Sequence, residues 1–137
     1  MGDLKADNYD RINMTGSFGN GAVDVGKKTL AAAQINDVIL FGKIRAGTTV
    51  HSMALQNAAL GGSTTIKLGY RPVAGNAAPV ADDDYWLAAT STSSLARPVS
   101  IAAPITFTKD VEVIGTVEGA AATGIVHAIV DYEYRGL

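Results

Sequence analysis

Cysteine is absent from the 137-residue chain, and this absence removes several kinds of chemistry at once. Without cysteine the chain has no disulfide, no thiolate nucleophile and no cysteine-ligated zinc, so its stability must come from packing or from assembly. Charge is also scarce, because only 18% of the residues are Asp, Glu, Lys or Arg, against roughly 25% in typical soluble domains. A low-charge surface of small residues favours a β-rich protein whose faces are covered by other protein.

Basic residues are too few and too scattered for a nucleic-acid-binding surface. The chain has 11 Lys and Arg against 13 Asp and Glu, and Lys27-Lys28 is its only basic doublet, whereas nucleic-acid-binding domains concentrate basic residues on one face. Long apolar runs are missing as well, and residues 1–11 lack the apolar centre of a signal peptide. We therefore expect a protein that is made in the cytosol and binds neither nucleic acid nor a membrane.

From residue 37 onward the apolar residues follow the periods of β-strands. The stretch 37–44 is apolar on both faces, which indicates a strand covered on both sides. Strict alternation over 63–71 and 124–135 indicates strands with one buried face. The full set of expected strands is 37–44, 49–56, 63–71, 97–101, 105–108, 111–118 and 124–135. Strands at this spacing with glycine-rich turns predict an all-β domain, a jelly-roll-like antiparallel β-sandwich, with a plain monomeric sandwich as the simplest alternative.

Two regions have no clear period. Residues 1–28 carry five glycines among isolated apolar residues, which predicts an extended, glycine-rich N-terminal arm with at most one short strand. The β-sandwich domain then covers 29–137, and residues 29–34 offer a single turn of helix. The stretch 73–94 is expected to be a long connection in which Tyr85 and Trp86 pack a short helical turn or strand onto the sheet.

Candidate catalytic groups do not form a known motif. His51 and His127 are the only histidines, and neither lies in a nucleophile motif. We expect His127 on the polar face of its strand and His51 half-buried, and we expect Glu112, Glu118 and Glu133 to be exposed. The sequence therefore predicts no enzyme activity, no catalytic residue, no cofactor and no metal site. The consecutive carboxylates Asp82, Asp83 and Asp84 leave a bound Ca²⁺ open as an alternative.

Aromatic residues offer the other candidate site. Tyr70, Tyr132 and Tyr134 share the apolar parity of their strands, so we expect them in the core. Tyr85 and Trp86 are open to two interpretations, an anchor for the connection or an interface hot spot. In the second case they are also suited to stacking on a sugar.

The order of segments in the second half of the sequence resembles a known family. The segments that carry the resemblance are 37–50 (DVILFGKIRAGTTV), 65–70 (TIKLGY), 84–87 (DYWL) and the long final strand 124–134. In this order they resemble the head decoration, or cement, proteins of tailed bacteriophages. The resemblance covers residues 26–136 and is one of pattern rather than of a specific signature.

The resemblance implies a function without catalysis. A protein of this family is made in the host bacterial cytoplasm, binds the outer surface of the capsid and stabilises it by bridging subunits of the major capsid protein. It implies a homo-oligomer, with a trimer favoured over a dimer. We expect contacts to the capsid or to a neighbouring copy from Phe18, Val23, Val25, Lys27, Lys28, Tyr85 and Trp86. The alternative is a receptor- or carbohydrate-binding β-module of a phage fibre or tail, in which Trp86 and Asp82–Asp84 would be central.

Overall fold

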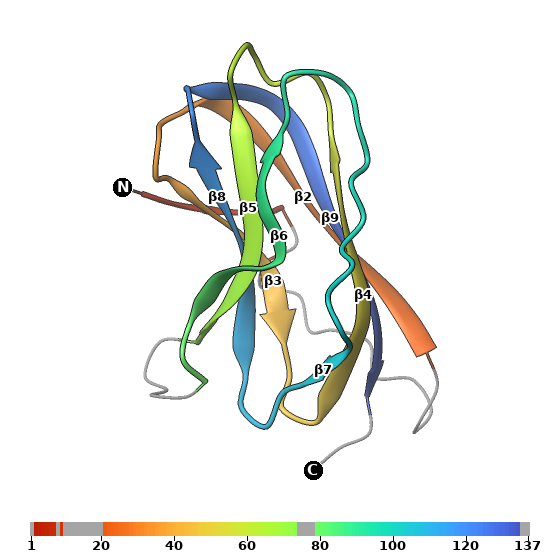
Figure 1. The fold of residues 1–137 in the computed structure, drawn as a ribbon. Coiled ribbons are helices and arrows are strands. Elements are labelled where there is room, and N and C mark those ends of the chain that lie inside the picture. The colour runs from red at the N-terminus through yellow and green to blue at the C-terminus, as the bar shows by residue number, and fades with distance from the viewer. Residues whose placement is uncertain (1, 8, 10–20, 74–78, 135–137) are drawn as a thin grey trace.

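The computed structural model describes residues 2–7, 9, 21–73 and 79–134, and these residues form strands and loops. Within them, no helix is long and apolar enough to cross a membrane. The strands are β1 (Asp3–Lys5), β2 (Gly21–Ala33), β3 (Val38–Ile44), β4 (Thr48–Asn57), β5 (Thr65–Pro72), β6 (Asp82–Ser91), β7 (Ile105–Thr106), β8 (Val111–Glu118) and β9 (Ala122–Tyr134). Figure 1 shows them in two layers, with β3, β8, β5 and β6 in one and β2, β9 and β4 in the other.

The strand order confirms the predicted jelly-roll sandwich. One sheet, here called sheet A, has the order β1-β3-β8-β5-β6, and the other, sheet B, has the order β2-β9-β4-β7. Four antiparallel pairs are nested within one another along the chain: β2 with β9, β3 with β8, β4 with β7, and β5 with β6. This nesting is what results when one long hairpin is rolled up into two sheets, which is the jelly-roll arrangement. Strand β1 is an addition at the edge of sheet A and runs parallel to β3.

The core lies between the two sheets and includes most of the residues that alternation assigned to it. Ile66 and Leu68 on β5 and Thr64 just before it are fully buried, and Tyr70 is 9% exposed. On β9, the inward residues Val126, Ala128, Val130 and Tyr132 are buried in the same cluster. Their alternate neighbours are partly or fully exposed on β9, as the period of two predicts.

Strand β2 corrects the expectation of an arm with at most one short strand and of a helical turn at 29–34. It pairs with β9 from Gly21 to Ala33 and therefore runs through the boundary expected between residues 28 and 29. The inward residues of this strand include Asp24, Gly26 and Lys28, so its sequence lacks the apolar alternation of a half-buried strand. Gly26 is required there, since a Cβ atom would lie 2.4 Å from the carbonyl oxygen of Phe41 on β3.

The connection expected over 73–94 is also more regular than predicted. Residues 82–91 form β6, a ten-residue strand along the edge of sheet A, so the acidic triplet lies on a strand rather than in a loop. Conversely, the strand expected over 97–101 is reduced to one isolated bridge with β4, Ala54 with Val99, and a second bridge joins Asn57 to Ala96 just before this stretch. Pro98 within this stretch has no N–H to donate, which prevents a continuous ladder.

A second, smaller cluster covers the outer face of sheet A. Ala6 and Tyr9 pack against Val38, Leu40 and Ile114, and all five are buried. This cluster explains why β3 is apolar on both faces, as predicted. It also buries both faces of β8, for which the sequence predicted one polar, exposed face.

Candidate interaction surfaces

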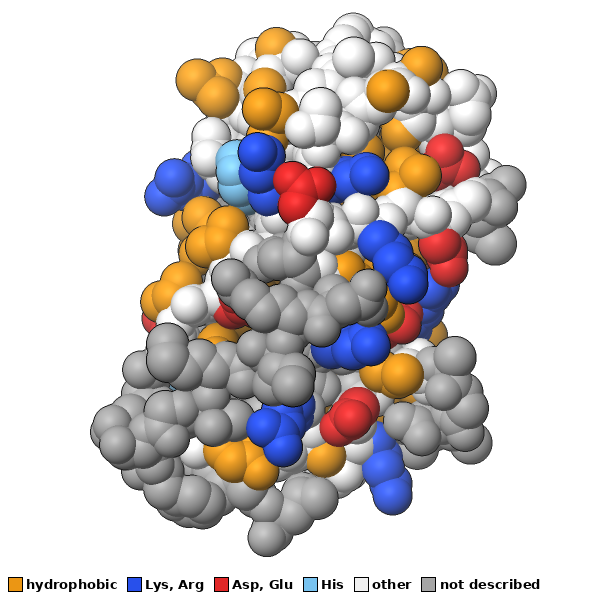
Figure 2. All heavy atoms as spheres, turned by 180° about the vertical axis from the view of Figure 1, so that it is seen from behind, with side chains coloured by type: hydrophobic (Ala, Val, Ile, Leu, Met, Phe, Trp, Pro, Cys, Tyr) orange, Lys and Arg blue, Asp and Glu red, His pale blue; other side chains and the backbone are white. Residues whose placement is uncertain are grey.

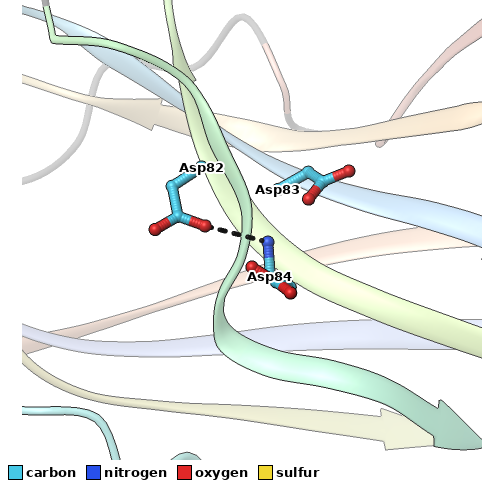
Figure 3. Close-up of side chains that lie close together, drawn as sticks. All are labelled: Asp82, Asp83 and Asp84. Carbon is cyan, nitrogen blue, oxygen red and sulfur yellow. Dashed lines mark hydrogen bonds between the residues drawn. The ribbon is translucent and has the colours of Figure 1, made fainter.

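The acidic triplet lies at the start of β6. Its three carboxylates lie within 4.8 Å of one another, and the backbone N–H of Asp84 donates to Asp82 over 3.4 Å (Figure 3). A hydrogen bond between the Asp84 and Asp82 side chains raises the pKa of Asp84, and desolvation adds to this effect. Ca²⁺ takes six to eight oxygen ligands, and the triplet offers one from each of three partly or fully exposed side chains.

Lys67 neutralises part of this charge. Its ammonium lies 3.0 Å from Asp83 and 3.3 Å from Glu118, and the hydrogen bond to Asp83 is the main cause of the raised pKa of Lys67. The triplet, Lys67 and Glu118 therefore form a surface charge cluster that links β5, β6 and β8.

Trp86 lies in the core and not at the surface. It is 4% exposed, and its ring centroid lies 5.7 Å from that of Tyr70 and 6.3 Å from that of Phe107. Tyr85 is half-buried, and its hydroxyl donates to the carbonyl oxygen of Ala103 over 3.0 Å. Of the two interpretations of this pair, the arrangement favours the anchor. Tyr134, expected in the core, is partly exposed.

His51 is exposed, where the parity of Met53 and Leu55 predicted it half-buried. The cause is a β-bulge, because the register between β4 and β9 shifts between Val50 and Ser52 and places the extra residue, His51, outside the ladder. The His51 ring nitrogen Nε2 lies 3.8 Å from the Glu133 carboxylate. The alternation of apolar and polar residues in the sequence does not reveal a bulge of one residue.

A buried charged network joins the N-terminal residues to sheet A. Glu112 is 6% exposed, which corrects its expected exposure. It accepts hydrogen bonds from the Tyr9 hydroxyl and from Arg71 Nε, the latter over 2.7 Å. Arg71 also binds Asp3 of β1 over 2.9 Å. These two carboxylates raise the pKa of Arg71 against the opposing effect of desolvation, which is the largest single contribution. Tyr9, an aromatic residue in a polar stretch, was the available signal for this network.

Three of the predicted contact residues lie together on the outer face of sheet B. Val23, Val25 and Lys27 are exposed at alternate positions of β2, with Val23 63% exposed. Lys28 has the opposite parity and is half-buried, and Phe18 lies outside the described residues. Lys27 lies 4.0 Å from the Asp7 carboxylate, and its carbonyl oxygen accepts from the Asp7 N–H.

Strand register extends this face into three rows that run across the sheet. The Ile129 row consists of Val25, Ile129, Ala54 and Val99, which are paired strand by strand. The basic row consists of Lys27, His127, Gln56 and Arg97, with Arg97 placed beside Gln56 by the register of the two bridges. The Ile125 row consists of Thr29, Ile125, Ala58 and Leu95 by the same register. Of the members of these rows, sequence reasoning identified Val25 and Lys27.

Figure 2 looks onto this side of the molecule. A histidine side chain lies between basic side chains, with an acidic one beside them, and hydrophobic side chains lie above and below this band.

Comparisons with known proteins identify chains of similar fold but no family. No family model matches the chain, and no curated protein sequence matches it. A chain in the capsid of Ralstonia phage GP4 superposes with a TM-score of 0.73 at 16% identity, covering 98% of this chain and 99% of that one. A chain in the capsid asymmetric unit of cyanophage Pam1 superposes with a TM-score of 0.65 at 20% identity, covering 93% and 96%. A chain in the acid-stable capsid of Helicobacter pylori bacteriophage KHP30 superposes with a TM-score of 0.61 at 15% identity, covering 85% and 89%. The chain thus has the fold of protein chains found in three phage capsids.

Proposed function

We propose that this chain is a virion structural protein that binds the outer surface of a phage capsid and stabilises it by bridging major capsid protein subunits. The observation that carries the proposal is the coverage of the Ralstonia phage GP4 match, which is nearly complete for both chains. That capsid chain has nearly the same length as this one and is a single sandwich rather than one domain of a larger subunit. A small chain of this kind, present as a separate component, suits attachment to a shell.

The surface of the molecule supports attachment through protein contacts. Large apolar side chains stand exposed on sheet B and along residues 95–101, among them Leu95 at 72% and Ile101 at 101% exposure. Exposed apolar groups gathered on one face of a soluble protein mark interaction surfaces. Many copies bound to one shell also gain avidity, so the individual contacts need only modest affinity.

The competing function, a sugar-binding fibre or tail module, loses its main support. Trp86 was the aromatic residue expected to stack on a sugar, and its ring is enclosed between Tyr70 and Phe107.

Cosedimentation with capsids tests the proposal. Purified protein is mixed with intact, genome-filled heads from particles that lack this gene product, and the pellet is quantified by mass spectrometry. We expect saturable binding at a fixed ratio to the major capsid protein, and the ratio reports whether trimers or dimers are bound. Filled heads are closed to added protein, so binding to them places the chain outside.

Stabilisation and bridging need their own readouts. Decorated heads should release their genome at a higher temperature than undecorated heads, and cross-linking should join one copy to two capsid subunits. Failure of the wild-type protein to pellet with any head form would overturn the proposed function.

A further inference from the structure

We infer that the outer face of sheet B is the capsid-docking face, and that it takes a capsid segment whose facing side chains run apolar, acidic, apolar at every second position. This inference rests on the proposed function and adds to it the surface of contact and the chemistry of the partner. It stands on the Ile129 row, the basic row and the Ile125 row described above.

Within the described residues, the outward apolar side chains of sheet B are exposed, while those of β3 and β8 in sheet A are covered. On sheet A, Ala6 and Tyr9 cover the outward side chains of Val38, Leu40 and Ile114. On sheet B, the corresponding outward side chains of Val25 and Ile125 are 39% and 40% exposed. The chain thus covers the outward apolar residues of β3 and β8 itself and leaves those of sheet B available for a partner.

Two of the three rows on this face are mainly apolar. Val99 at 59% and Leu95 at 72% exposure extend the Ile129 and Ile125 rows beyond β4. The Ile129 row is therefore apolar from β2 to the bridged segment and the Ile125 row from β9 to this segment, so the two form a surface rather than scattered single residues. Such contiguous exposure in water is unfavourable and is relieved when a partner covers it.

The basic row indicates the charge of the partner. The basic row between the apolar rows presents Lys27, Arg97 and the His127 ring, together with the Gln56 amide. Arg97 makes no ion pair within the described part of the chain, and the His127 Nδ1 atom is buried without a hydrogen-bond partner. Asp7 lies near Lys27, at the β2 end of the row, and therefore does not neutralise Arg97 at the other end. A carboxylate from the partner complements the row at Arg97.

The distance between adjacent rows indicates the conformation of the partner. Adjacent rows are two residues apart along each strand, which is about 6.7 Å at the rise of an antiparallel strand. A partner in extended conformation repeats its facing side chains at the same interval, so its residues fall on successive rows. Sheet-on-sheet packing of this kind places the two backbones about 10 Å apart. The occupant is therefore a β-segment lying along the strands of sheet B.

Charge and apolar variants with matched controls test the face. Arg97→Glu reverses the free end of the basic row, and Lys109→Glu makes the same change at an exposed lysine between β7 and β8. Leu95→Asp breaks the Ile125 row, and Val80→Asp makes a similar change at a side chain that is 85% exposed outside the rows. All four positions are exposed, and circular dichroism melting confirms folding. We expect Arg97→Glu and Leu95→Asp to weaken binding to filled heads at least tenfold, and the two controls to stay within twofold of the wild type.

Cross-linking identifies the occupant. The chain has no cysteine, so Val99→Cys carries a single photo-reactive maleimide next to the basic row. We expect the cross-linked peptide to come from the major capsid protein and to contain an Asp or Glu with apolar residues two positions before and after it.

The outcomes separate this inference from the proposed function. Wild-type binding that all four variants retain overturns the docking face and leaves the proposed function standing. A cross-link to a second copy of this chain, or to a capsid peptide without the acidic residue, overturns the choice of partner. Absence of wild-type binding overturns the proposed function and this inference with it.

Discussion

At the scale of single residues, Glu112 shows what a strand pattern leaves out. Its position on β8 alternates with Val111 and Val113, and a carboxylate at that parity is expected in solvent. The residue is buried because Tyr9 and Arg71 come to it from distant parts of the chain. Sequence periodicity reports the strand itself and carries no information about a segment that later covers its outer face.

Removal of the Glu112 carboxylate should destabilise the fold. In Glu112→Ala the half-buried Arg71 guanidinium and the Tyr9 hydroxyl both lose a hydrogen bond to a buried carboxylate, so we expect the free energy of unfolding to fall by about 2–4 kcal/mol. Urea denaturation followed by Trp86 fluorescence measures this, because Trp86 is the only tryptophan. Asp3→Asn, which removes the exposed partner of Arg71, should cost less than about 1 kcal/mol. Equal effects of the two changes would contradict the assignment of Glu112 as the centre of the network.

At the scale of elements, the sequence predicted strands that alternate and missed strands that do not. The bounds expected for β8 agree with the structure, and those for β5 and β9 agree within two residues. Strand β2 was missed because its inward side carries Asp24, Gly26 and Lys28, and β6 because its sequence begins with three aspartates. In both cases the strand exists because a neighbour supplies the hydrogen bonds and the apolar contacts.

The close approach of β2 to β3 gives a prediction at this scale. Gly26→Ala places a methyl group 2.4 Å from the Phe41 carbonyl oxygen, and backbone cannot yield as a side chain would. We expect a loss of about 2–4 kcal/mol in the free energy of unfolding, because the two sheets must separate locally. Gly42→Ala on β3 is the matched control, since nothing lies within 4 Å of its added Cβ atom. Thermal unfolding of both variants measures the difference, and equal melting temperatures would show that the sheets are not in contact at Gly26.

At the scale of the whole molecule, the candidate surface depends on which strands become neighbours. The sequence indicated Val23, Val25 and Lys27 as contact residues, and they share one face of β2. It did not indicate Ile129, because alternation does not reveal that β9 lies next to β2 and β4. Rows that cross a sheet combine residues far apart in the chain, so they follow from topology and register alone.

Truncation distinguishes the sandwich from the segment that precedes it. Deletion of residues 1–28 removes most of β2 and uncovers the backbone edge of β9, so we expect a protein that aggregates or fails to unfold cooperatively. Deletion of residues 1–20 retains β2 whole and removes β1 and Tyr9, so we expect a folded protein of lower stability. Circular dichroism melting and analytical size exclusion compare the two. If the protein without residues 1–28 unfolded cooperatively and remained monomeric, β2 would be dispensable for the fold.

The position of β9 also sets the order of events during synthesis. Sheet B places β9 between β2 and β4, and both of these strands leave the ribosome long before it. Until β9 emerges, the two strands have no central partner, and their apolar sides stay exposed to solvent. The nascent chain must therefore be kept from aggregating, by chaperones or by rapid elongation, because contacts between distant segments form late and slowly. The chain thus passes its most vulnerable interval before β9 has been synthesised.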